Sequence, residues 1–282
     1  MNHNGFQYKE GLNVDIIPFN PSGDCEPGGL YYTTAEHILD FLEFGSLIAD
    51  IIVLEDAKVY KNGNKFKADK IVLSNIRPIE DYVDSLLYED QLNMVNRSGY
   101  HLKYVKNQTP EICLEAIKQN GLALQYVKEQ TPEICLKAMK QNGEALYYVK
   151  EQTFEICMEA VKQNACALRY VWNQIPVLCL EAVKQNGHAL RYVWNQTPTL
   201  CLEAVKQNGL ALEHINRQTF KLCMEAVKQN GLALRDVISQ TPKLGIEAVK
   251  QNGDALQYVN NKRLKSKQTM YQAVSSWMTN RT

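Results

Sequence analysis

Cysteine is the most regularly spaced reactive side chain in this 282-residue sequence. Thiols at fixed spacing could form disulfides or hold zinc. However, equivalent positions in stacked helices lie about 8–10 Å apart, whereas a disulfide needs Cα atoms within about 7 Å. No C-x-x-C pair or cysteine–histidine cluster has zinc spacing. We therefore predict small buried side chains and no metal ligands at the six cysteines that recur every 22 residues: Cys113, Cys135, Cys157, Cys179, Cys201 and Cys223.

Arginine and tryptophan form an unusual pair in two consecutive copies of the repeat. Arg169 precedes Trp172 by three residues, and Arg191 precedes Trp194 in the same way. With His188 they should form one contiguous binding patch, because arginine and tryptophan are enriched at interaction hot spots. The alternative is that the tryptophans fill a groove between repeats, with cation–π contacts to the arginines.

Residue patterns typical of catalysis are missing from the repeats. They contain no nucleophile–base pair, phosphate-binding loop or paired carboxylates. We therefore predict no catalytic residues, no cofactor and no enzymatic activity for them.

The elements that must position these side chains come from a 22-residue repeat, which indicates an array whose units bury their apolar faces against one another. Thr109-Pro110 starts a helix as N-cap and first residue, and Asn120-Gly121 should end it with a left-handed glycine. A shorter helix is expected over about 122–128, with a constant inner face and a variable outer face. Seven copies begin at Gln108, Gln130, Gln152, Gln174, Gln196, Gln218 and Gln240.

The recurring Asn120 and Gln108 are interpreted as structural, with amides that bond to backbone groups. Leucine-rich repeats have a similar length, but a leucine position of that pattern becomes Glu144 and His188 in other copies, and no stretch alternates with period 2. The fold class predicted is mainly α: an α-solenoid of short two-helix repeats with an expected right-handed superhelix.

Residues 1–79 differ in character and predict a small α/β or α+β domain. Strands are expected at 14–19, 30–33, 49–54 and 67–73, a helix at 36–44 closed by Gly45, and a turn at Asn62-Gly63. Lysines at 58, 61, 65, 67 and 70 form a basic hairpin, interpreted as a solvated face. The predicted domains are 1–79, the solenoid 80–261 with a degenerate first repeat at 80–107, and a C-terminal capping helix and basic tail at 262–282.

Charge and hydropathy restrict the class of partner. The formal net charge is zero, which argues against a general nucleic-acid or membrane binder. An acidic excess in residues 1–107 and a basic tail leave self-association open. The sequence has neither a run of 18 apolar residues nor a signal-peptide core. An intracellular protein is expected.

The repeat core at residues 180–193, L-E-A-V-K-Q-N-G-H-A-L-R-Y-V, resembles a repeat family of unknown function found in giant viruses and protists. The resemblance covers roughly residues 80–282. Residues 28–34, 41–45 and 65–70 look like a domain that precedes repeat arrays in giant-virus proteins. Neither family has an assigned activity, so the resemblance implies a viral protein in the host cytoplasm rather than a mechanism.

The function predicted is a non-catalytic scaffold that binds a protein partner, as yet unidentified, through the variable outer face of the solenoid. One alternative is an ADP-ribosyltransferase-like N-terminal domain, since residues 29–34 are weakly similar to a segment of those enzymes. That fold also needs a histidine and a glutamate, for which His3 and Glu55 are available. Another alternative is single-stranded nucleic-acid binding through the Arg/Trp patch.

Overall fold

The structure is a computed structural model that describes residues 2–3, 6–22 and 26–260. The chain divides into two compact units, residues 1–119 with 126–128, and residues 120–125 with 129–282. These units do not coincide with the division at residue 79, which remains a prediction. The predicted capping helix and tail at 262–282 lie outside the described residues.

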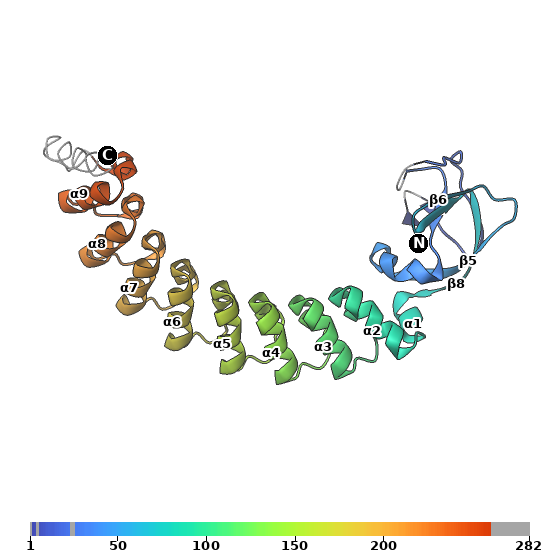
Figure 1. The fold of residues 1–282 in the computed structure, drawn as a ribbon, viewed down its shortest axis with the longest axis horizontal. Coiled ribbons are helices and arrows are strands. Elements are labelled where there is room, and N and C mark those ends of the chain that lie inside the picture. The colour runs from blue at the N-terminus through green and yellow to red at the C-terminus, as the bar shows by residue number, and fades with distance from the viewer. Residues whose placement is uncertain (1, 4–5, 23–25, 261–282) are drawn as a thin grey trace. The chain divides into compact units, whose positions relative to one another are not determined.

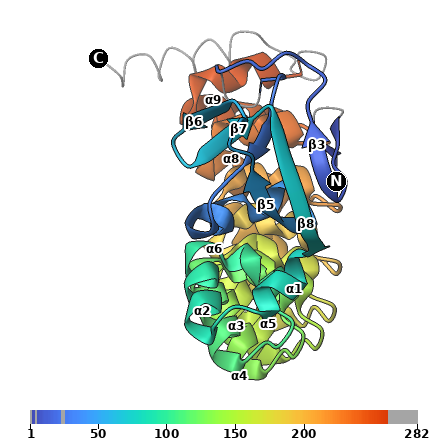
Figure 2. The same ribbon diagram turned by 90° about the vertical axis from the view of Figure 1, so that its right-hand side faces the viewer.

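The first unit contains short antiparallel sheets (Figures 1 and 2). Because every strand pair described is antiparallel, this part is α+β rather than α/β. Leu30, Ala68, Ile71 and Leu73 form its core. In sheet order, the strands are β1 Asn2–His3 and β2 Phe6–Gln7; β3 Gly11–Val14, β8 Lys70–Pro78 and β5 Leu47–Val53; β4 Leu30–Tyr32, β7 Lys65–Ala68 and β6 Val59–Asn62.

Several strand boundaries differ from those predicted. The strand expected at 14–19 is wrong: β3 ends at Val14, and the backbone N–H of Ile17 bonds back to the Asp15 carboxylate. The strand expected at 67–73 is two strands, β7 and β8, which are interrupted at Asp69. The turn expected at Asn62-Gly63 lies one residue later, at Gly63-Asn64: Asn62 ends β6 and pairs with Lys65, and Gly63 has a φ of 57°. The helix expected at 36–44 is a 3₁₀ helix, η1 Ala35–Phe44.

Lys67 corrects the interpretation of the basic hairpin as a solvated face. Its side chain is only 1% exposed, and its Nζ donates to the carbonyl of Asn20 at 2.9 Å. The Nζ also lies 5.1 Å from the centre of the Tyr31 ring. Gly29, at a φ of 144°, gives the space: a Cβ there would collide with the Lys67 side chain. The lysine is therefore a core element that fixes the loop before β4.

The first helices pack onto these strands. Within the first unit, the Tyr104 hydroxyl donates to the Leu42 carbonyl at 2.8 Å, and Arg97 pairs with Asp40 at 2.9 Å. The predicted degenerate first repeat carries the same helix pair as the others, because α2 (Tyr88–Arg97) and η2 (Gly99–Tyr104) begin 22 residues before the helices of the next pair. A short helix, α1 Ile79–Asp84, precedes it.

Each repeat consists of an α-helix followed by a 3₁₀ helix rather than two α-helices. In the second unit, α4 to α9 lie side by side in chain order (Figure 1). The pairs are α2 Tyr88–Arg97 and η2 Gly99–Tyr104, α3 Pro110–Gln119 and η3 Gly121–Tyr126, α4 Pro132–Gln141 and η4 Gly143–Tyr148, α5 Phe154–Gln163 and η5 Ala165–Tyr170, α6 Pro176–Gln185 and η6 Gly187–Tyr192, α7 Pro198–Gln207 and η7 Gly209–His214, α8 Phe220–Gln229 and η8 Gly231–Asp236, and α9 Pro242–Gln251 and η9 Gly253–Tyr258.

Threonine and asparagine define where these helices begin and end. The Thr131 side chain caps α4 by accepting the N–H of Ile134, as the sequence predicts. Asn142 then serves both helices: its N–H donates to Ala138, and its side chain accepts the N–H of Glu144 at the start of η4. An asparagine in extended conformation at φ −154° thus ends the α-helix and starts the 3₁₀ helix.

The left-handed glycine predicted at the helix end is wrong. No repeat glycine within the described residues has a positive φ. The glycine is needed because its backbone lies against the next repeat: a Cβ on Gly143 would collide with the carbonyl oxygen of Ala160. Its N–H donates to the Gln163 side chain at 2.6 Å. The constraint comes from a neighbouring repeat, not from local backbone conformation.

Ala165 takes this glycine position in one copy and changes the local bonding. In five other copies of the second unit, the N–H of the glycine donates to the side chain of the glutamine that lies 20 residues on. At Ala165, the amide of Gln185 donates instead to the carbonyl of Lys162 at 2.7 Å. The extra methyl group has therefore displaced one hydrogen bond between repeats.

The glutamine that opens each copy forms what we call the glutamine seam. Gln130 Nε2 donates to the carbonyls of Leu124 and Tyr148 at 3.3 and 2.9 Å, and its Oε1 accepts the N–H of Lys150 at 2.9 Å. The partners lie in the preceding and following 3₁₀ segments, so one side chain joins neighbouring repeats. The structural interpretation of the asparagine and glutamine is confirmed. The seam consists of Gln108, Gln130, Gln152, Gln174, Gln196, Gln218 and Gln240.

The repeat cysteines are buried and unpaired, as expected. The thiol of Cys157 lies 3.5 Å from Gln152 Oε1, where it is a weak donor to the seam. Burial raises the pKa of this thiol to about 11, so it stays protonated at neutral pH and is unreactive.

Candidate binding surface

Trp172 and Trp194 are exposed side chains held on an ordered backbone. They follow η5 and η6, and their backbone N–H groups donate to the seam residues Gln152 and Gln174 at 3.0 and 3.1 Å. Their side chains are 61% and 67% exposed. This exposure does not fit the alternative in which the tryptophans fill a groove between repeats.

The two arginines of the predicted patch stack on tyrosines rather than on the tryptophans. The Arg169 guanidinium lies 4.6 Å from the centre of the Tyr170 ring, and it pairs with Glu144 of the preceding 3₁₀ helix at 2.8 Å. Arg191 lies 4.9 Å from the centre of the Tyr192 ring. Stacking restricts both guanidinium groups at the surface, which lowers the entropy lost when they bind a ligand.

Tyr147 is an exposed aromatic residue that the sequence analysis missed. It is 65% exposed, and its ring centre lies 5.0 Å from that of Tyr148 and 5.3 Å from that of Tyr170. The available signal was its place in the repeat, where the other copies carry glutamine, arginine or glutamate. The aromatic surface therefore begins one repeat earlier than expected.

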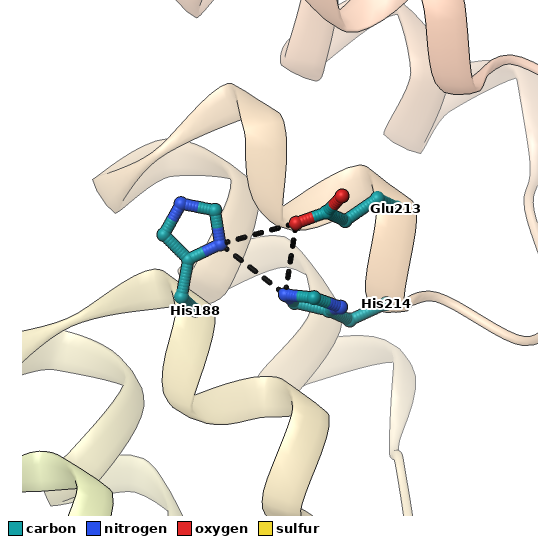
Figure 3. Close-up of side chains that lie close together, drawn as sticks. All are labelled: His188, Glu213 and His214. Carbon is teal, nitrogen blue, oxygen red and sulfur yellow. Dashed lines mark hydrogen bonds and ion pairs between the residues drawn. The ribbon is translucent and has the colours of Figure 1, made fainter.

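His188 contacts polar residues of the next repeat (Figure 3). Its Nδ1 lies 3.2 Å from His214 Nε2 and 3.6 Å from Glu213 Oε1. The sequence analysis expected no metal ligands and singled out neither Glu213 nor His214. The contact was missed because it joins residues 25 and 26 positions apart. Whether Arg169, Trp172, His188, Arg191 and Trp194 act as one contiguous patch stays a prediction.

The first unit contains an apolar cavity of about 520 Å³. Tyr8, Tyr31, Ile38 and Phe41 contribute to its lining. Glu55, the glutamate available for an ADP-ribosyltransferase-like site, is exposed in the turn after β5 and is not part of that lining. The Tyr31 hydroxyl donates to the carbonyl of Glu26. Within the described residues, Glu55 therefore does not join Tyr31 in the lining of this cavity.

Four stretches of the chain match the domain of unknown function DUF4116. Three of them overlap, at residues 89–131, 109–154 and 131–171, and the fourth covers residues 197–239. The predicted resemblance of the repeats to a giant-virus family of unknown function is confirmed. Among residues 2–3, 6–22 and 26–260, no helix has the length and apolar character needed to cross a bilayer.

Similar proteins come from Acanthamoeba polyphaga mimivirus. R868, named as a putative ankyrin repeat protein, is 35% identical over 120 residues, which are 37% of this chain and 59% of R868. R229, named likewise, is 30% identical over 83 residues, 26% of this chain and 27% of R229. The uncharacterized protein R869 is 38% identical over 61 residues, 21% of this chain and 44% of R869. The matches thus span less than two thirds of each relative. No solved structure matches the chain.

The repeat geometry differs from that implied by the relatives' names. An ankyrin repeat has about 33 residues with a β-turn and two helices. Here the unit has 22 residues and pairs an α-helix with a 3₁₀ helix, as in α4 and η4. The chain is a helical repeat protein similar to mimivirus repeat proteins, with a shorter unit than an ankyrin repeat.

Proposed function

We propose that this chain is a non-catalytic scaffold that binds a protein partner through the outer face of its 3₁₀ helices. The predicted contact residues are Arg169, Trp172, His188, Arg191 and Trp194. The partner surface that fits them presents apolar side chains flanked by carboxylates. The names of the mimivirus relatives, which refer to another class of repeat protein, agree with a binding role.

The observation that carries the proposal is the exposure of two tryptophans in consecutive repeats. Exposed tryptophan is unfavourable in water, and neither Trp172 nor Trp194 is needed for the core, because the equivalent residues are Lys128, Lys150 or Asn216 elsewhere. A partner that covers both rings would bury a large apolar area, and the neighbouring arginines would orient its acidic groups.

The test is affinity capture from cell lysate, followed by purification of the retained protein and measurement of its Kd. The full chain is compared with the Trp172→Ala/Trp194→Ala double variant. We expect the double variant to weaken binding at least about 10-fold. Its free energy of unfolding should change by less than about 0.5 kcal/mol per substitution, because both rings are exposed.

Ile238→Ala is the matched control, since Ile238 is an exposed apolar residue at the same repeat position. It should leave the Kd of the partner unchanged. An equal loss in the control, or a large drop in Tm in the double variant, would overturn the proposed surface. Binding of single-stranded RNA or DNA that is lost with the two tryptophans would favour the nucleic-acid alternative instead.

A further inference from the structure

His188, Glu213 and His214 bring three metal-binding atoms together on neighbouring 3₁₀ helices. His188 begins η6, whereas Glu213 and His214 end η7 (Figure 3). The distance between His188 Nδ1 and His214 Nε2 is 3.2 Å, and Glu213 Oε1 lies 3.2 Å from His214 Nε2 and 3.6 Å from His188 Nδ1. The three atoms form a nearly equilateral triangle.

This triangle has the size of one face of a zinc coordination tetrahedron. Zinc binds imidazole nitrogen and carboxylate oxygen at about 2.0–2.2 Å, so the ligand atoms of a tetrahedral site lie about 3.3–3.5 Å from one another. The observed separations of 3.2–3.6 Å fall around that value. Two histidines and one glutamate also form the protein ligand set of known zinc sites that keep a fourth position open.

All three residues are departures from the repeat, and they meet at one place. The position of His188 holds leucine, cysteine, glutamate or aspartate in other copies, and the position of Glu213 holds glutamine, tyrosine or arginine. His214 replaces the tyrosine found at Tyr192 and at most equivalent positions. Glu144 and Arg169 show that residues at this 25-residue spacing contact each other elsewhere, since they form an ion pair. The fold core requires none of the three side chains.

The surroundings orient the carboxylate toward the imidazoles. Arg235 lies 3.8 Å from Glu213 Oε2, the oxygen that points away from the two histidines. Desolvation lowers the pKa of His214, as do His188 and Arg191 to a smaller extent, whereas the Glu213 and Asp236 carboxylates raise it. The positive charges of Arg191 and Arg235 repel an additional cation, so binding requires all three ligands.

We propose that His188, Glu213 and His214 bind a divalent transition-metal ion, best matched by Zn²⁺, that joins η6 to η7. The remaining coordination position faces solvent, because Glu213 is exposed and His188 is partly exposed. The ion would be a cross-link between two repeats at the point where another pair of copies has the Glu144–Arg169 ion pair. This inference shares His188 with the proposed contact surface, but its test requires no protein partner.

The experiment is calorimetric titration of the metal-stripped full chain with Zn²⁺ alone at pH 7.5. We expect one equivalent to bind, and Tm to rise with zinc concentration. Cobalt substitution should give the absorption bands of a four-coordinate site. His188→Leu and His214→Tyr restore the residues that other copies carry, so the fold is kept. Each should weaken zinc binding at least about 10-fold.

Two controls separate this site from other zinc-binding groups. Cys166→Leu removes the half-buried thiol of the repeats, and His37→Gln removes an exposed histidine near Asp40. Neither should change the zinc affinity. Absence of zinc binding by the full chain would overturn the proposal and leave the three residues as a hydrogen-bonded cluster. Zinc affinity equal in the parent, His188→Leu and His214→Tyr would overturn it as well.

Discussion

The glutamine seam and the outer face of the 3₁₀ helices behave in opposite ways, although they belong to the same 22-residue unit. Along the seam, Gln130 and its equivalents repeat the same contact with the carbonyl at the end of the following 3₁₀ helix. On the outer face, the residue 20 positions after a seam glutamine changes from Lys128 to Trp172 to Ile238. Its backbone N–H nevertheless keeps its bond to a seam glutamine in each of these three copies.

This difference shows how a repeat protein separates stability from recognition. The seam uses backbone groups of the outer segment, so it places no demand on the outer side chains. Trp172 can therefore replace lysine without loss of the hydrogen bond that positions it. Recognition residues can change from copy to copy while the supporting contacts stay constant.

The largest expected effect comes from breaking the seam. Gln130→Ala removes the amide that donates to the carbonyls of Tyr148 and Leu124 and accepts the N–H of Lys150. We expect a loss of about 2–4 kcal/mol in the free energy of unfolding. Urea denaturation measures this change in the free energy of unfolding. Gln125→Ala, at an exposed position outside the seam, is the control and should cost less than about 0.5 kcal/mol. An equal loss of unfolding free energy in the two variants would show that the seam contact adds no stability.

A smaller effect is expected where the backbone of one repeat meets the next. Gly143→Ala should destabilise by about 1–3 kcal/mol, because its Cβ would collide with Ala160. Ala165→Gly is the reverse change in the next repeat and should restore the bond from that N–H to Gln185. Hydrogen exchange at residue 165 should slow in this variant. If Gly143→Ala is as stable as the parent, the close-approach explanation of the glycine is wrong.

The smallest effect is expected at a helix start that lacks its cap. Ile175 replaces the N-cap threonine of α6, and no side-chain cap bond forms there. Ile175→Thr should stabilise the chain by about 1 kcal/mol. Thr131→Ala, which removes the cap of α4, should destabilise it by a similar amount. Thermal denaturation should show a higher Tm for Ile175→Thr and a lower Tm for Thr131→Ala than for the parent. A destabilised Ile175→Thr variant would mean that the isoleucine packs more favourably than a cap bond.

The sequence predicts the parts of the repeat that depend on neighbours along the chain. The Thr-Pro start and the apolar positions of each α-helix are local signals, and both are confirmed in α4. The 3₁₀ geometry of η4 and the reason for Gly143 were not predicted, because both depend on the next repeat. Likewise, Lys67 looks like a surface residue until the loop at Asn20 closes over it.

The candidate surface likewise has parts that could be predicted from the sequence and parts that could not. Trp172 and Trp194 could be singled out because they differ from the other copies at one position. The contact of His188 with His214 could not, because it requires the register between adjacent 3₁₀ helices. A search at 25 and 26 residues for complementary departures from the repeat would have found it.

The glutamine seam also has a mechanical consequence. Because Gln130 and its equivalents bond only to adjoining segments, a pulling force on an end of the array loads one seam contact at a time. Such an array should peel in successive steps, each of which releases 22 residues, about 75 Å of extended chain. The repeat that carries Ala165, which lacks the hydrogen bond from this N–H to the next repeat, should unfold at lower force than its neighbours.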